Sequence, residues 1–178
     1  SGYYEDNRYA VALFIGNIVP HKGAHIAIEL CRRAGIPLWV AGPLLDGAYG
    51  ERVINDCGVK GATYIGTLDE TEKYRAMSQA SLVICPANTG YQNYHETAQL
   101  VVIEAGFCGT SVLGSRSGGL PEYVEKMGGK CGGNMREMLA LLPGMMERTD
   151  HKETRERTVE NFDLTRFKDE WMGILGAG

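Results

Sequence analysis

Residues 9–34 read YAVALFIGNIVPHKGAHIAIELCRRA, and this stretch sets the pattern for most of the chain. Its first part, Tyr9 to Ile15, is rich in apolar and β-branched side chains and predicts a buried strand. A turn bounded by Gly16 and Gly23 follows, and the segment from about Gly23 to Ala34 predicts a helix. The repeating unit is therefore a strand, a turn and a helix, in that order.

The same unit recurs along the chain. Further strands are predicted at Pro37–Ala41, Ala62–Ile65, Leu82–Cys85 and Ser111–Leu113, and further helices at about Tyr49–Asp56, Asp69–Ala80 and Ala98–Phe107. Strict alternation predicts right-handed βαβ units, and so an α/β fold with a Rossmann-like, doubly wound parallel sheet. After Met127 the strand pattern stops, and residues 128–133, GGKCGG, predict a flexible turn into terminal helices.

Length and composition indicate one globular domain. A chain of 178 residues falls within the roughly 100–200 residues of one ordinary domain, so we expect residues 1–178 to form a single unit. Hydrophobic residues at 44% and charged residues at 22% are average for globular proteins and exclude disorder. A net charge of -4 with scattered Lys and Arg excludes nucleic acid as the expected partner.

The cysteines and the chain start bear on the compartment. Five cysteines, an odd number with no metal-binding spacing, predict buried free thiols in a reducing cytosol and no metal site. The chain begins with Ser1 and Gly2 and carries no signal pattern, which is typical of a cut fragment or of the remnant of a tag. No apolar run approaches the roughly 20 residues of a membrane helix. We therefore expect a soluble, cytoplasmic domain.

An apolar stripe marks the C-terminal segment. Phe167, Trp171 and Leu175 are spaced at i, i+4 and i+8, which places them on one face of a helix. This face packs either against the domain's own sheet or against a neighbouring domain.

The first loop, residues 16–23, follows a strand and precedes a helix. Free N–H groups at a helix N-terminus bind anions, and Lys22 adds a positive charge. The alternative is an ordinary turn with a solvated lysine, because the loop matches neither common phosphate-binding glycine motif.

One glutamate lies just before the predicted helix at residues 98–107, and another lies inside it. Glu104 lies in a run apolar enough to be buried, so it needs a polar partner. Glu96 lies eight residues earlier, up to about 12 Å away at 1.5 Å per residue. That span suits two carboxylates that bind hydroxyls at opposite ends of a diphosphate. The alternative is a capping Glu96 and an unrelated Glu104 paired to a nearby lysine.

A third loop, residues 115–122, also follows a strand. Gly118 and Gly119 permit close approach of a ligand to the backbone, and Pro121 with Glu122 suits a helix start. The loop is explained equally well as a tight turn, but it falls on the same sheet edge as the other two features.

Together these segments resemble the C-terminal domain of the group 1 (family 4) retaining glycosyltransferases, which have the two-domain GT-B fold. The resemblance rests on Leu100–Ala105 with Cys108–Thr110, on Gly118–Glu122, and on two glutamates separated by seven residues. Residues 16–23 resemble the family's phosphate loop, and residues 64–80 resemble its base-binding loop and helix.

The resemblance implies a role for each matching residue. It implies that Glu104 holds the ribose hydroxyls of a nucleotide sugar, and that Glu96 and Lys22 form the catalytic pair, on the sugar hydroxyls and the distal phosphate. The other implied contacts are Gly16 and Asn17 in the phosphate loop, Gln99, Leu100 and Val101 at the diphosphate, Thr67 and Leu68 at the base, and Gly118 and Gly119 in the pocket wall.

The sequence also departs from the family pattern. Asn17 stands where the family usually has arginine, so one of two cations at the leaving phosphate is absent; His21, His25 and Arg116 are candidates to replace it. The chain has no Asp-x-Asp pair, which agrees with metal independence. With the resemblance, we expect a hexosyl-type transfer that needs no metal and no cofactor.

The resemblance implies a donor-binding half that transfers a sugar with retention when joined to an absent N-terminal acceptor domain. The acceptor is expected in the cytoplasm or at a membrane face, with peripheral membrane association through that absent domain. The alternatives are a degenerate, non-catalytic nucleotide-binding module and a GT-B sugar-nucleotide epimerase. The missing GxGxxG motif argues against a dinucleotide-dependent oxidoreductase.

Overall fold

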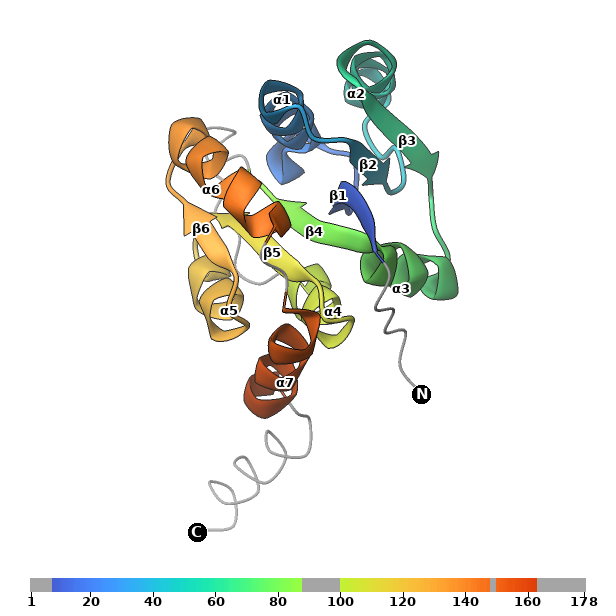
Figure 1. The fold of residues 1–178 in the computed structure, drawn as a ribbon. Coiled ribbons are helices and arrows are strands. Elements are labelled where there is room, and N and C mark those ends of the chain that lie inside the picture. The colour runs from blue at the N-terminus through green and yellow to red at the C-terminus, as the bar shows by residue number, and fades with distance from the viewer. Residues whose placement is uncertain (1–7, 88–99, 148–149, 163–178) are drawn as a thin grey trace, which may run out of the picture.

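A computed structural model describes residues 8–87, 100–147 and 150–162 of the chain. Its centre is a six-stranded sheet in the order β3-β2-β1-β4-β5-β6, with every neighbouring pair parallel (Figure 1). The strands are β1 (Tyr9–Ile15), β2 (Leu38–Ala41), β3 (Ala62–Gly66), β4 (Ala80–Cys85), β5 (Ser111–Ser115) and β6 (Lys130–Gly132).

Helices cover both faces of this sheet (Figure 1). They are η1 (Pro20–Lys22), α1 (Ala24–Ala34), α2 (Gly47–Lys60), α3 (Glu70–Gln79), α4 (Leu100–Phe107), α5 (Leu120–Lys126), α6 (Met135–Glu147) and α7 (His151–Phe162). One hydrophobic cluster joins the sheet to α1, α2 and α6, and a second joins the opposite face to α3, α4 and α5. The predicted doubly wound, Rossmann-like α/β fold is confirmed.

The side chains of β1 explain its central position. Ala12 and Phe14 belong to the first cluster, while Val11 and Leu13 belong to the second. Because successive side chains of a strand point to opposite faces, a continuous apolar run suits a strand buried on both sides. The predicted strand at residues 9–15 therefore has the bounds that the structure shows.

The helix ends follow local chemistry. The Asp69 carboxylate accepts from the Glu72 amide and the Glu72 side chain accepts from the Asp69 amide, which forms a capping box at the start of α3. The Asp46 carboxylate caps α2 by accepting from the Tyr49 amide. That cap starts α2 at Gly47 and the helix runs to Lys60, so it is longer at both ends than the predicted segment.

The prediction of a flexible turn at residues 128–133 is wrong. Lys130–Gly132 forms β6, which pairs in parallel with Leu113–Ser115 of β5. The glycines here serve close packing: an added Cβ would lie 2.5 Å from the Val112 carbonyl oxygen at Gly129, and 2.6 Å from Met138 Cγ at Gly132. A glycine-rich stretch beside a sheet edge can thus be a tightly packed strand. The terminal helices predicted to follow are present as α6 and α7.

Arg8 forms hydrogen bonds that connect several elements at the amino-terminal edge of the sheet. Its guanidinium donates to the carbonyl oxygens of Met77 (3.1 Å), Ala80 (3.0 Å) and Cys108 (2.6 Å), and to the hydroxyl of Thr110. One side chain thereby ties the end of α3, the start of β4 and the turn between α4 and β5.

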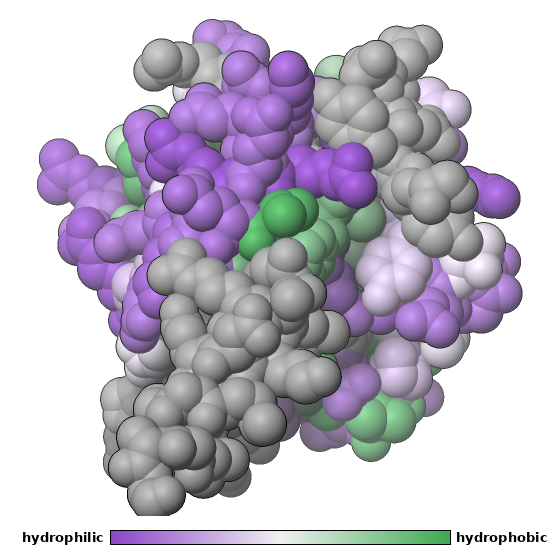
Figure 2. Space-filling model, turned by 90° about the horizontal axis from the view of Figure 1, so that it is seen from below, coloured by the Kyte–Doolittle hydropathy of each residue, from purple (hydrophilic) through white to green (hydrophobic). Residues whose placement is uncertain are grey.

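The surface below the sheet in Figure 1 is largely hydrophilic, with small hydrophobic areas (Figure 2). Helix α7 lies on that side, and ion pairs such as Arg157–Glu153 run along it. No described helix is long and apolar enough to span a membrane. The C-terminal stripe predicted at Phe167, Trp171 and Leu175 lies outside the described residues.

All five cysteines are buried and free, as predicted. Burial raises the pKa of the Cys31 thiol to about 12. Burial likewise raises the pKa values of the Cys57, Cys108 and Cys131 thiols to about 11. Because the thiolate is the reactive form, these four thiols pack as small apolar groups and not as nucleophiles.

Candidate functional site

Backbone packs against backbone at the carboxyl-terminal edge of the sheet. The Gly16 amide donates to the Ala41 carbonyl (3.1 Å), and the Gly42 amide donates to the Gly66 carbonyl (2.9 Å). At Gly42 an added Cβ would lie 1.8 Å from the Gly16 oxygen, and φ is +140°. Only glycine fits there, so the loops after β1, β2 and β3 form one connected rim.

A cavity of about 450 Å³ opens at this edge, between the ends of β1 and β4. It is lined by Phe14, Ile15, Gly16, Asn17, Lys22, Ile84, Cys85, Leu100 and Val101. The helix after β1 lies on one face of the sheet and the helix after β4 on the other, so the strand order reverses here. Ligands of doubly wound sheets bind at such a switch point. The cavity brings together five predicted site residues: Gly16, Asn17, Lys22, Leu100 and Val101.

The first loop differs from the prediction in one respect. The His25 amide donates to the Tyr49 hydroxyl (3.2 Å), and the amides of Ile26 and Ala27 donate to the Gly23 carbonyl. These amides at the start of α1 are therefore occupied within the protein, and the expected set of free N–H groups is wrong for them. The positive charge at the cavity comes from Lys22.

Two of the three cations considered as replacements for arginine at position 17 are otherwise engaged. Burial, and then the charge of Arg52, lower the pKa of His25, whose Nδ1 lies 2.7 Å from the Tyr49 hydroxyl. His25 is therefore neutral at pH 7. Arg116 pairs with Glu137 of α6 at 3.2 Å, and neither His25 nor Arg116 lines the cavity.

Glu104 is paired with a lysine. Lys73 Nζ donates to Glu104 Oε1 at 2.6 Å, which joins α3 to α4. Each side chain is 25% exposed, so Glu104 is less buried than its apolar neighbours in the sequence suggest. Partial burial disfavours the charged ammonium, but the hydrogen bond to Glu104 and its charge outweigh this and raise the pKa of Lys73. The lysine partner that the sequence left open is present.

The remaining predicted residues lie around the same edge. Thr67 and Leu68 follow β3, with Thr67 exposed and Leu68 packed on the second cluster, and neither lines the cavity. Gly118 and Gly119 precede α5, in the loop after β5, and do not line it either. Glu96 and Gln99 lie outside the described residues, so their predicted roles stay predictions.

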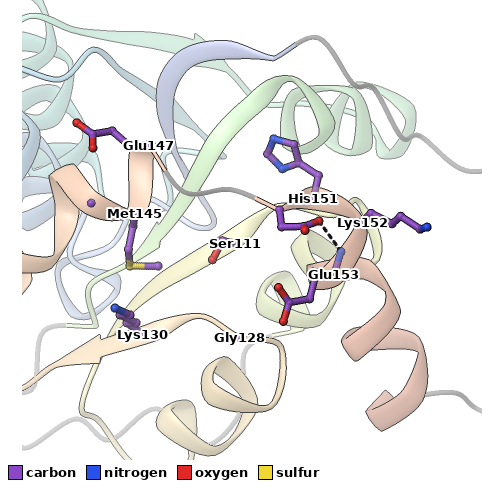
Figure 3. Close-up of a pocket in the computed structure, with 10 residues that line it drawn as sticks. Ser111, Gly128, Lys130, Met145, Glu147, His151, Lys152 and Glu153 are labelled. Carbon is purple, nitrogen blue, oxygen red and sulfur yellow. Dashed lines mark hydrogen bonds between the residues drawn. The ribbon is translucent and has the colours of Figure 1, made fainter.

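A larger hollow, about 770 Å³, lies away from this edge, at the start of β5 and β6 and of α7 (Figure 3). Its charged side chains do not converge: Glu147 and Lys152 point away from one another. His151 Nδ1 lies 3.0 Å from the Gly109 carbonyl oxygen, and Asp150 accepts from the Glu153 amide. The described residues form no catalytic cluster here.

Sequence reasoning missed two groups of site residues. Phe14, Ile15, Ile84 and Cys85 form the cavity wall, and their place at the ends of two apolar strands could have indicated this. Lys73 gave no signal of its own, because a lysine within a helix is usually solvated.

Residues 3–161 match the sequence family described as "Glycosyl transferases group 1". The chain belongs to this family. The match spans most of the chain and includes the cavity residues, so the resemblance inferred from the sequence is confirmed.

Individual relatives agree with the family. Over 126 residues, 65% of this chain, it is 30% identical to proteins named glycogen synthase from two strains of Mycobacterium tuberculosis. It superposes with a TM-score of 0.82 and 22% identity on AviGT4, a glycosyltransferase involved in avilamycin A biosynthesis. It superposes with a TM-score of 0.80 and 19% identity on Anabaena Alr3699/HepE in complex with UDP.

The chain spans only part of each relative. It covers 28% of the glycogen synthases, 53% of AviGT4 and 50% of HepE, while 97% of this chain aligns with each of the two structures. The Rossmann-like fold is thus that of about half of each of these two solved structures.

Proposed function

We propose that this chain binds a nucleoside diphosphate sugar at the carboxyl-terminal edge of its sheet and supplies the donor site of a glycosyltransferase. The observation that carries the proposal is the cavity at the switch point, which gathers Lys22, Asn17 and the first described turn of α4 in a member of this family. Its volume of about 450 Å³ is within the usual range of roughly 300–1,000 Å³ for small-molecule sites.

The relatives support the class of ligand. HepE, whose fold this chain shares, has been solved with UDP and with UDP-glucose. A diphosphate placed in the corresponding cavity here would meet Lys22, whose ammonium suits phosphate. Its nucleoside would extend toward Glu104 and the loop at Thr67 and Leu68. We propose Glu96 as the residue that binds its sugar.

The chemistry follows from the charge that develops. Cleavage of the bond between sugar and phosphate leaves a nucleoside diphosphate, and Lys22 stabilises the growing negative charge in a partly enclosed site. We propose transfer of a hexosyl group with retention and without a metal or other cofactor. The acceptor, cytoplasmic or at a membrane face, would bind the part of the enzyme that this chain does not span.

Calorimetric titration of the chain with UDP, GDP and ADP tests the donor site. We expect one of the three to bind, and Lys22→Ala to weaken that binding by about 1–3 kcal/mol, because a charged hydrogen-bond partner is lost. Lys126→Ala removes a lysine paired with Glu122 on α5 and is the matched control, with no change expected. Failure of all three nucleotides to bind would sink the proposal.

Asn17 favours a second candidate, a nucleotide-binding module without turnover. It occupies the cavity at the position of the family's usual arginine, and neither His25 nor Arg116 replaces that charge at the cavity. Assays of the full-length protein with donor sugar and acceptor separate the two functions. Transfer that Asn17→Arg accelerates supports the enzyme; nucleotide binding with no transfer in either form supports the module. Conversion of the donor without acceptor would instead identify an epimerase.

A further inference from the structure

The Lys73–Glu104 pair stands apart from the other ion pairs among the described residues. Most of those join residues three or four apart on one helix. Lys73 and Glu104 join two helices, and each side chain is only 25% exposed. Taking two charges partly out of water costs free energy, so such a pair adds little stability by itself. The position of the Lys73–Glu104 pair explains its presence better than stability does.

The pair lies beside the cavity. Leu100 and Val101 line the cavity, and Glu104 follows them by four and three residues on α4. Residues with this spacing lie on one side of a helix, with Cβ atoms about 5–6 Å apart. Lys73 belongs to α3, the helix that follows the Thr67–Leu68 loop. A ligand that extends from the cavity toward that loop would therefore pass the pair.

The two oxygens of the Glu104 carboxylate differ in their hydrogen bonds. Glu104 Oε1 accepts from Lys73, and no described residue donates to Oε2. Oε2 is thus left as an acceptor for a ligand hydroxyl, with its direction fixed by the bond to Oε1. The ammonium also cancels the charge of a carboxylate that would otherwise repel a diphosphate in the neighbouring cavity.

We propose that Lys73 is a positioning residue for the donor site, which holds Glu104 so that one carboxylate oxygen accepts a hydrogen bond from the ribose of the nucleotide. This inference rests on the proposed function and deepens it. Lys73 does not touch the nucleotide; it acts through Glu104. Its effect should therefore appear in the discrimination between nucleotides with and without ribose hydroxyls.

The test compares binding of a nucleoside diphosphate with binding of its 2′,3′-dideoxy form, with the base that the wild-type chain binds. We expect the wild-type chain to prefer the ribose form about tenfold, as one hydrogen bond to a charged group predicts. Lys73→Met should reduce this preference to about twofold, and Lys73→Arg, which keeps a charged donor, should retain most of it. Lys126→Met is the control and should leave it unchanged.

Two further measurements separate positioning from a purely structural role. Lys73→Met combined with Glu104→Gln should show the same preference as Glu104→Gln alone, because the lysine acts through the glutamate. Thermal unfolding of each variant reports any loosening of α3 against α4.

Unaltered ribose preference in Lys73→Met would overturn the inference. So would tighter binding of the ribose form by Lys73→Met, since the pair would then act as a barrier to the ligand. Either result requires that the wild-type chain binds a nucleotide, so it is distinct from failure of the proposed function.

Discussion

The two edges of the sheet are built in different ways. At the amino-terminal edge one side chain, Arg8, joins α3, β4 and the turn after α4 by hydrogen bonds. At the carboxyl-terminal edge glycine backbones approach one another and leave a cavity with Lys22 in its lining. The hydrogen bonds of the first edge serve stability, whereas we propose that the second edge binds a ligand. Substitutions at the two edges should therefore separate stability from binding.

The largest effect is expected at Gly42. Alanine there would place Cβ 1.8 Å from the Gly16 oxygen and keep φ at +140°, so the rim must shift. We expect a loss of about 3–4 kcal/mol in the free energy of unfolding, measured by urea denaturation. Gly47→Ala is the control, since no atom beyond its chain neighbours and its own helix backbone lies within 4 Å of its added Cβ. Equal denaturation midpoints for the two variants would contradict the claim that only glycine fits at position 42.

Arg8→Ala tests the opposite edge. Loss of the guanidinium leaves carbonyl groups of Met77, Ala80 and Cys108 without this donor, and should cost about 2–3 kcal/mol of unfolding free energy. Nucleotide affinity, measured by calorimetry below the melting temperature, should not change. Arg33→Ala, at an exposed position of α1, is the control for loss of an arginine. A parallel loss of affinity would show that the two edges are coupled.

Asn17→Arg adds a positive charge at the carboxyl-terminal edge. A second cation in the cavity beside Lys22 should tighten nucleoside diphosphate binding about tenfold, which corresponds to about 1.4 kcal/mol. The gain should shrink as salt concentration rises, because screening weakens the charge interaction. Binding that is unchanged at low salt would place the phosphates away from this loop.

The smallest effect is a pH dependence at His25. Burial and Arg52 lower the pKa of its imidazole in the folded state below the usual 6.5, so the unfolded chain binds a proton more readily. This contribution to stability is complete above pH 6.5 and is lost as the pH falls from 6.5 through the lower folded pKa. His25→Gln should lose less unfolding free energy between pH 8 and pH 5 than the wild-type chain. An identical loss in both would contradict this assignment.

The sequence predicts the fold well where apolar runs are unambiguous. Val11 to Phe14 are buried on alternate faces, and a strand covered on both faces of a parallel sheet needs that pattern. The prediction from sequence fails at β6. Gly129 and Gly132 are typical of a turn in the sequence, but in the structure they pack against Val112 and Met138.

The site is predicted in part for a similar reason. Lys22 and Asn17 adjoin a strand end, so topology alone places them at the cavity. The pairing of Glu104 with Lys73 depends on how α3 packs against α4, which no local pattern encodes. The occupied amides of Ile26 and Ala27 depend on the turn at Gly23, which spacing does not reveal.

The short outer strand β6 has a consequence for how copies of the domain behave at high concentration. It offers only three residues of backbone at that side of the sheet, and Lys130, which is exposed, puts a charge on it. An added strand from another molecule would find few hydrogen-bonding groups and would have to bury that charge. This flank is therefore a poor template for edge-to-edge aggregation.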